Sequence, residues 1–219
     1  MIPLRDVIPS RSRPVVTVTL IVLNVLAFGY ELSLPEATLP TFMRTWGLVP
    51  GAFQPQTLLT SLFLHGSWSH LIGNLWYLWI FGDNVEDRCG HGRFLVFYLL
   101  TGIVASAGQM LLHPTSLLPT IGASGAIAGV LGAYVVLYPH SRVLTLLPLI
   151  IYWDIIEVPA FFLLGGWFLL QLLSATSVGS SAGMDGGIAF MAHVAGFVAG
   201  ALGIVVFRRR DALRDRWVD

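Results

Sequence analysis

Apolar residues run through most of this chain in long uncharged segments, and short stretches between them hold nearly all of the charge. A helix that crosses a bilayer needs about 20 mostly apolar residues. The uncharged run from Phe94 to Ser141 is long enough for two such helices, and Pro114 and Pro119 divide it. The pattern predicts six membrane-spanning helices, at about 14–32, 65–82, 94–112, 122–138, 158–174 and 187–207.

One further apolar segment, 143–157, is interrupted by Pro148 and carries Asp154 and Glu157. Counting it as a seventh span puts the five C-terminal arginines on the outer side, against the tendency of arginine to stay inside. We therefore expect an interfacial or re-entrant segment on the inner side. The predicted fold is an all-α integral membrane bundle of six spans.

The arginines set the predicted orientation of the bundle. With six spans and the N-terminus inside, eleven of the twelve arginines lie on the inner side, and Arg44 alone lies outside. Both termini are therefore expected in the cytoplasm. The chain is divided into a cytoplasmic N-terminal segment (1–13), a membrane domain (14–207) and a basic cytoplasmic tail (208–219).

Composition agrees with this assignment and excludes other classes. Hydrophobic residues make up 55% of the chain and charged residues 11%, against about 25% charged in soluble domains. The net charge is 12 − 12 = 0, which gives no attraction for nucleic acid, and the apolar content excludes a disordered chain. The single Cys89 excludes an internal disulfide and a Cys-rich metal site.

Four polar side chains stand out in the spans because polar groups are costly in hydrocarbon. They are His70 and Asn74 in the second span, Ser124 in the fourth and His193 in the sixth. These three spans run from outside to inside, and each polar residue falls within the first two turns or so of its helix. The four side chains are therefore expected at one depth, near the outer face.

Spacing on each helix suggests how these groups meet. His70 and Asn74 are four positions apart and share a helix face. His193 shares a face with Gly196 and Gly200, and small residues allow membrane helices to pack closely. The fourth and sixth spans could then bring the serine hydroxyl and the imidazole within hydrogen-bonding reach, the minimum arrangement for nucleophilic catalysis.

Each residue also has a simpler interpretation. A serine in a helix often bonds to a carbonyl one turn back, and a histidine or an asparagine often only joins helices. A metal site formed by His65, His70 and His193 competes with catalysis. However, no His-Glu-x-x-His spacing occurs, and no carboxylate lies in the three spans concerned. We expect no metal and no cofactor.

The motifs resemble those of the rhomboid family of intramembrane serine proteases. Those motifs are Gly122-Ala123-Ser124-Gly125, His70-x-x-x-Asn74, Ala192-His193 followed by Gly196 and Gly200, and Glu86-x-Arg88 after the second span. The resemblance covers about 14–207. It implies a Ser124 nucleophile, a His193 general base, and an oxyanion held by Asn74, His70 and the Ser124 backbone N–H.

The resemblance also implies a partner and surroundings. Substrates are expected to be single-span membrane proteins cut near the outer face of the bilayer, and a prokaryotic cell membrane is the default location. Loop 33–64 is expected to lie partly in the outer interface, and loop 175–186 to form a mobile cap. The fifth span, with Trp167 and Phe168, is the side past which a substrate helix would enter.

One position departs from the family pattern. Many members have an aromatic residue four positions after the serine, stacked on the catalytic histidine, and this chain has Ala128 there. Another residue must hold the His193 ring, or the ring is looser and activity is lower.

Two alternatives to a protease remain open. One is a catalytically silent rhomboid-like protein that binds membrane helices. The other is a small channel, although the polar groups cluster at one end only.

Overall fold

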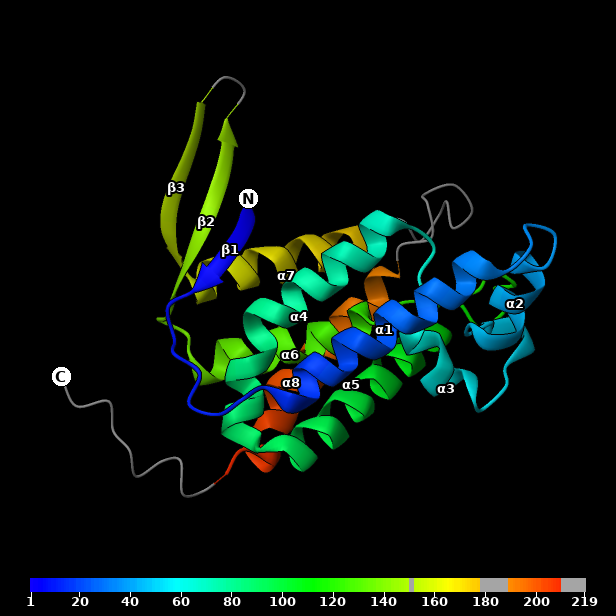
Figure 1. Ribbon diagram of the computed structural model, residues 1–219, viewed down its shortest axis with the longest axis horizontal. Helices are drawn as coiled ribbons and strands as arrows, with labels where there is room; N and C mark the ends of the chain where they lie inside the picture. The colour runs from blue at the N-terminus through cyan, green and yellow to red at the C-terminus, as the bar shows by residue number, and fades with distance from the viewer. Residues whose placement is uncertain (150–151, 178–188, 210–219) are drawn as a thin grey trace.

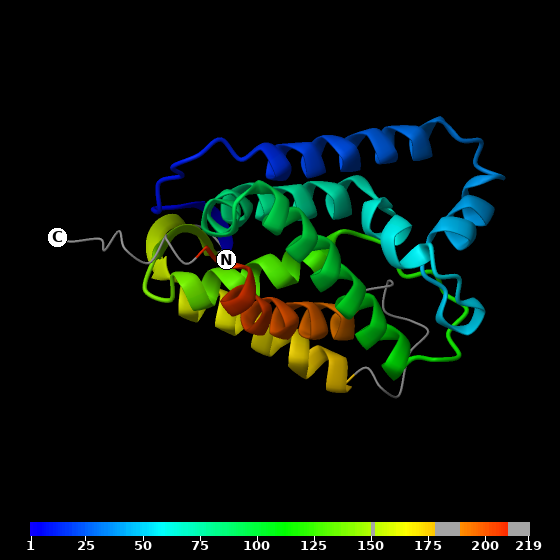
Figure 2. The same ribbon diagram turned by 90° about the horizontal axis from the view of Figure 1, so that it is seen from below.

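The computed structural model describes residues 1–149, 152–177 and 189–209, and this part of the chain is mostly helical (Figure 1). The helices are α1 (Val15–Ser33), α2 (Leu39–Trp46), α3 (Thr57–Thr60), α4 (Trp68–Cys89), α5 (His91–Leu112), α6 (Ser124–Leu137), α7 (Ala160–Ser177) and α8 (Phe190–Phe207). Two 3-10 turns, η1 (Pro50–Ala52) and η2 (Ser61–Phe63), lie between α1 and α4. Figure 2 shows α1 and α7 on opposite sides of the bundle, with α4, α6 and α8 between them.

Six of these helices overlap the six apolar segments predicted to span the membrane. Three of them, α1, α5 and α8, are long and apolar enough to cross a bilayer. Helix α6 and the Ala160–Ser174 part of α7 are shorter apolar helices. The number of spans and the sides on which the ends lie stay predictions. The cap loop at 175–186 and the tail at 208–219 extend into 178–188 and 210–219, which are outside the described residues.

Residues 142–149 and 152–159 form two paired β-strands, so the prediction of an all-α fold is wrong in this segment. Strands β2 (Arg142–Leu149) and β3 (Tyr152–Pro159) pair antiparallel, and β1 (Ile2–Asp6) adds to the other edge of β2. The physical reason is that burial alternates from one residue to the next along β2, which is the side-chain period of a strand and not of a helix. Val143 and Thr145 are buried, and the residues on either side of each are not. Figure 1 shows strands β2 and β3 projecting away from the helices.

The N-terminal strand is attached to the helices by two side-chain hydrogen bonds. The indole Nε1–H of Trp76 in α4 donates to the Pro3 carbonyl at 2.6 Å. The Tyr134 hydroxyl in α6 donates to the Asp6 carboxylate at 2.7 Å. Burial raises the pKa of Asp6 above its usual value. The start of the chain is therefore held against two helices that lie far from it in the sequence.

A buried carboxylate near the end of α4 organises the start of α1. Glu86 is 1% exposed and accepts hydrogen bonds from the backbone N–H groups of Val16 and Thr17 at 2.9 and 2.8 Å. It also accepts from the Thr17 hydroxyl at 2.7 Å and lies 2.6 Å from His91 Nδ1. Since α1 has no side-chain cap of its own, Glu86 satisfies its first N–H groups and places negative charge at the positive end of the helix dipole.

Helices α6 and α8 touch backbone to backbone. A Cβ atom built on Gly200 would overlap the carbonyl oxygen of Gly129, and one built on Gly196 would overlap that of Gly125. Gly132 of α6 meets the carbonyl of Phe197 in the same way. The glycines on the His193 face of α8 therefore allow the close approach that the sequence pattern predicts.

We expect Gly200→Ala to lower the free energy of unfolding by about 1–3 kcal/mol, because the added methyl group forces α6 and α8 apart. Thermal unfolding in detergent micelles measures the effect. The control is Gly166→Ala in α7, where a Cβ meets no atom within 4 Å. Equal unfolding temperatures for the two variants would contradict backbone contact between α6 and α8.

Candidate active site

Ser124 is the first residue of α6, and it follows a turn that is hydrogen-bonded to the backbone before α4. The Gly122 N–H donates to the Ser61 carbonyl at 2.8 Å. Gly122 has φ +119°, a conformation that side chains with a Cβ rarely adopt. No side-chain hydrogen bond caps the start of α6, and Ser124 lies at the positive end of the helix dipole.

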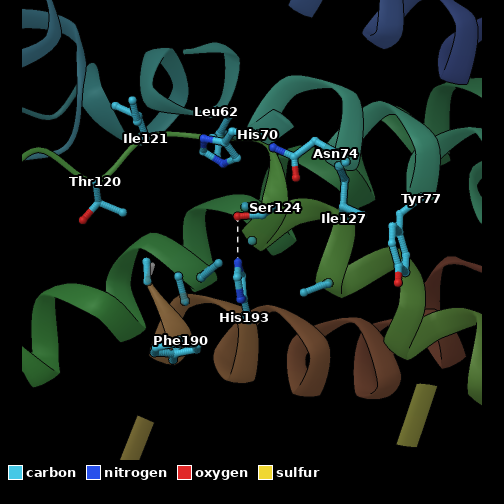
Figure 3. Close-up of a pocket in the computed structure, with 18 of the residues that line it drawn as sticks. Leu62, His70, Asn74, Tyr77, Thr120, Ile121, Ser124, Ile127, Phe190 and His193 are labelled. Atoms are coloured by element: carbon cyan, nitrogen blue, oxygen red, sulfur yellow. Dashed lines mark hydrogen bonds between the residues drawn. The ribbon is translucent and has the colours of Figure 1, made fainter. Parts of the chain in front are cut away.

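His193 lies in the first turn of α8, and its imidazole points at the serine (Figure 3). Its Nε2 is 2.8 Å from Ser124 Oγ, and its Nδ1 is 2.7 Å from the amide oxygen of Gln171 in α7. Because an amide oxygen only accepts hydrogen bonds, the ring proton is on Nδ1. The hydroxyl then donates to Nε2, which is the arrangement needed for an imidazole to take the serine proton.

His70 and Asn74 lie on α4, across the serine from the histidine of α8 (Figure 3). The hydroxyl of Ser67 caps α4 by accepting from the His70 N–H at 3.2 Å. The His70 ring lies against Gly122, since a Cβ built there would be 2.6 Å from His70 Nε2. The Asn74 amide nitrogen is 2.9 Å from His65 Nε2. His70 and Asn74 therefore bring side chains with N–H groups to the side of Ser124 opposite His193 (Figure 3).

All four predicted site residues line one cavity of about 700 Å³. Its other walls are largely apolar and come from helices α4, α5, α6, α7 and α8 and from the segments that precede α4 and α6; they include Leu62, Ile121, Ile127, Leu131, Trp167 and Phe190. The structure therefore brings together a hydroxyl, an imidazole and two N–H donors beside an apolar space. In the described part of the chain, no three His, Cys, Asp or Glu side chains gather closely enough to hold a metal ion.

The sequence reading gave His65 no catalytic role, yet it is in direct contact with the site. Its side chain is 1% exposed, and its ring meets that of His70 edge to face at 5.0 Å between centroids. The Glu31 carboxylate of α1 accepts from the His65 backbone N–H at 3.2 and 3.3 Å. The signal available in the sequence was the short spacing of His65, His70 and Asn74, with their imidazole and amide groups.

Gln171 was also missed. It carries the only amide side chain in the apolar run Ala160–Leu173, and polar groups in such runs tend to bond to neighbouring helices. That isolated amide was the signal that could have identified it.

Comparison with known proteins agrees with the motifs. A family model described as Rhomboid domain matches residues 52–210. Rhomboid-like protein 11, chloroplastic, from Arabidopsis thaliana is 31% identical over 151 residues, which cover 66% of this chain and 49% of that protein. Rhomboid protease GluP from Bacillus subtilis is 46% identical over 76 residues (35% of this chain, 14% of GluP). Rhomboid protein 1, mitochondrial, from Saccharomyces cerevisiae is 28% identical over 150 residues (67% and 40%). The chain therefore matches about half or less of the length of these relatives.

We expect Gly122→Ala to slow the reaction of Ser124 with a fluorophosphonate by about 10-fold or more. The new methyl group meets His70 Nε2 at 2.6 Å, and the backbone strain of a Cβ at this φ adds about 1–2 kcal/mol. The rate constant of labelling in detergent measures it. The matched control is Gly90→Ala, at the other described glycine with positive φ (+80°), between α4 and α5. It lowers thermal stability but leaves the labelling rate of folded protein unchanged, and equal rates for the two variants would overturn the expectation.

Proposed function

The chain belongs to the rhomboid family, and on that premise we propose that it is an intramembrane serine endopeptidase. The observation that carries the proposal is the 2.8 Å hydrogen bond between Ser124 Oγ and His193 Nε2, on the wall of a largely apolar cavity. Its substrates are proposed to be transmembrane proteins, and its catalytic pair to be a serine and a histidine without an orienting carboxylate.

The proposed reaction begins when His193 Nε2 takes the hydroxyl proton and Ser124 Oγ bonds to the carbonyl carbon of the scissile peptide. The tetrahedral intermediate collapses, the C–N bond breaks, and the imidazolium gives its proton to the leaving amine. Water then attacks the acyl-enzyme with the same imidazole as base, which releases the acid and restores the hydroxyl.

The negative oxygen of each tetrahedral intermediate needs N–H donors. We assign that role to the side chains of Asn74 and His70 and to the backbone N–H of Ser124. Support comes from their location around one cavity and from the position of Ser124 at the start of α6. Losing one such donor costs about 100- to 1000-fold in turnover.

The proposed topology has six spans, with residues 1–13 and the basic tail 208–219 in the cytoplasm and the membrane domain at 14–207. Six helices that overlap the apolar segments support the number, and the distribution of arginine supports the orientation. The site then lies toward the outer face, where water reaches the acyl-enzyme.

Substrates are proposed to be single-span proteins with weakly helical residues near that face, because the scissile peptide must unwind. We propose a prokaryotic cell membrane as the location; relatives include chloroplast and mitochondrial proteins as well as bacterial ones.

We expect Ser124→Ala and His193→Ala each to abolish cleavage of a single-span substrate in proteoliposomes. The first removes the nucleophile and the second the base that activates it. Gel analysis of the cleavage products and fluorophosphonate labelling measure the two steps. Ser33→Ala and His113→Ala, at the end of α1 and after α5, are the matched controls and keep full activity. Wild-type protein that neither cleaves nor labels would support the silent rhomboid-like alternative instead.

We expect the two ends of the predicted bundle to differ in reactivity toward a membrane-impermeant maleimide. Thr115→Cys, in the loop between α5 and α6, labels in intact cells; Ser10→Cys labels only after the membrane is permeabilised. The native Cys89 is fully buried and gives little background. Labelling of Ser10→Cys from outside would contradict the proposed orientation.

A further inference from the structure

Helix α7 places two side chains on the ring of His193. Trp167 and Gln171 are four residues apart and so lie on one face of the helix. The amide oxygen of Gln171 is 2.7 Å from His193 Nδ1. The Trp167 ring lies 5.7 Å from the imidazole between centroids, at an interplanar angle of 38°. The imidazole is thus held at its second nitrogen and contacted at its ring from one neighbouring helix.

The residue four positions after the serine does not contribute in this way. Ala128 is fully buried in α6, and its methyl group has no ring to stack on an imidazole. The groups that hold the histidine therefore come from α7. Helix α7 is itself packed on α8 by aromatic contact, with the Phe168 and Phe197 rings stacked at 4.6 Å.

We propose that Gln171 is the positioning residue of His193. It accepts the Nδ1–H hydrogen bond, which keeps the proton on that nitrogen and leaves Nε2 unprotonated and aimed at Ser124. The inference rests on the proposed function, because positioning matters only if the imidazole acts as a base. It extends the serine–histidine pair to a Ser–His–Gln arrangement, with a neutral amide in the place where many serine proteases have a carboxylate.

A neutral orienting group has a different consequence from a charged one. A carboxylate stabilises the imidazolium that forms during the reaction, whereas an amide sets the tautomer and the ring direction without adding charge. The groups that face His193 in the described residues are the Ser124 hydroxyl from α6, Gln171 and Trp167 from α7, and the titratable ring of His70 from α4. Replacing the Gln171 amide by a carboxylate therefore adds a negative charge at the acceptor of the hydrogen bond that the structure gives to His193 Nδ1.

The experiment compares Gln171→Leu, Gln171→Glu and wild type by the rate constant of fluorophosphonate labelling between pH 5 and pH 9. Gln171→Leu removes the acceptor, and we expect it to lower the rate about 10- to 100-fold. Gln171→Glu keeps an acceptor at the same reach, and we expect it to recover most of the rate. Its negative charge favours the protonated imidazole, so the acid limb of its pH profile moves to higher pH.

Leu170→Ala, on the exposed side of α7, is the control and leaves both the rate and the profile unchanged. Two results would overturn the inference while leaving the proposed function intact: a Gln171→Leu rate equal to wild type, or a Gln171→Glu profile superimposable on wild type. The second readout stands even if Gln171→Leu does not fold. Wild-type protein that does not label overturns the proposed function, and the positioning role with it.

Discussion

The backbone contact between α6 and α8 is the constraint on which the rest of the site depends. Gly196 lies three residues after His193, and it touches the carbonyl of Gly125, the residue after Ser124. The contact that holds the two helices together is therefore one turn of helix or less from both members of the hydrogen-bonded pair. Any side chain larger than hydrogen at Gly196 increases the distance between the helix axes. It thereby also lengthens the 2.8 Å hydrogen bond between Ser124 and His193.

The opposite wall of the site is held by polar groups that satisfy one another. Glu31 of α1 bonds to the backbone of His65, and the His65 ring bonds to the amide of Asn74 in α4. Because the amide nitrogen already has one partner, its remaining N–H has a restricted direction. Such a network keeps its geometry only when every member is present. Helix α1 precedes the start of the family match at residue 52. It nevertheless contributes, through Glu31, to the arrangement of the side chains at the site.

Much of this arrangement could be predicted from the sequence. Long apolar runs indicate helices that could cross a membrane, and the few polar residues inside those runs are candidates for a site. Ser124, His193, His70 and Asn74 all meet in one cavity. The paired strands β2 and β3 could not be found in the same way, since total hydropathy does not distinguish a period of two from one of 3.6. The hydrogen bond from Gln171 to His193 crosses from α7 to α8, so it depends on how α7 is rotated against α8. The sequence alone does not give that rotation. The link from Glu31 to His65 likewise depends on a loop path that no periodicity encodes.

The small sheet has a consequence for the order in which the chain is assembled. Ile2 pairs with Leu146, which is 144 positions later in the sequence (146 − 2). At synthesis rates of roughly 5–20 residues per second, about 7–30 s separate the two strands on the ribosome. By the time β2 is made, α1, α4, α5 and α6 have been synthesised, and only then can the backbone groups of β1 pair with β2. Strand β1 therefore reaches its native strand hydrogen bonds only after the residues of these four helices have been synthesised.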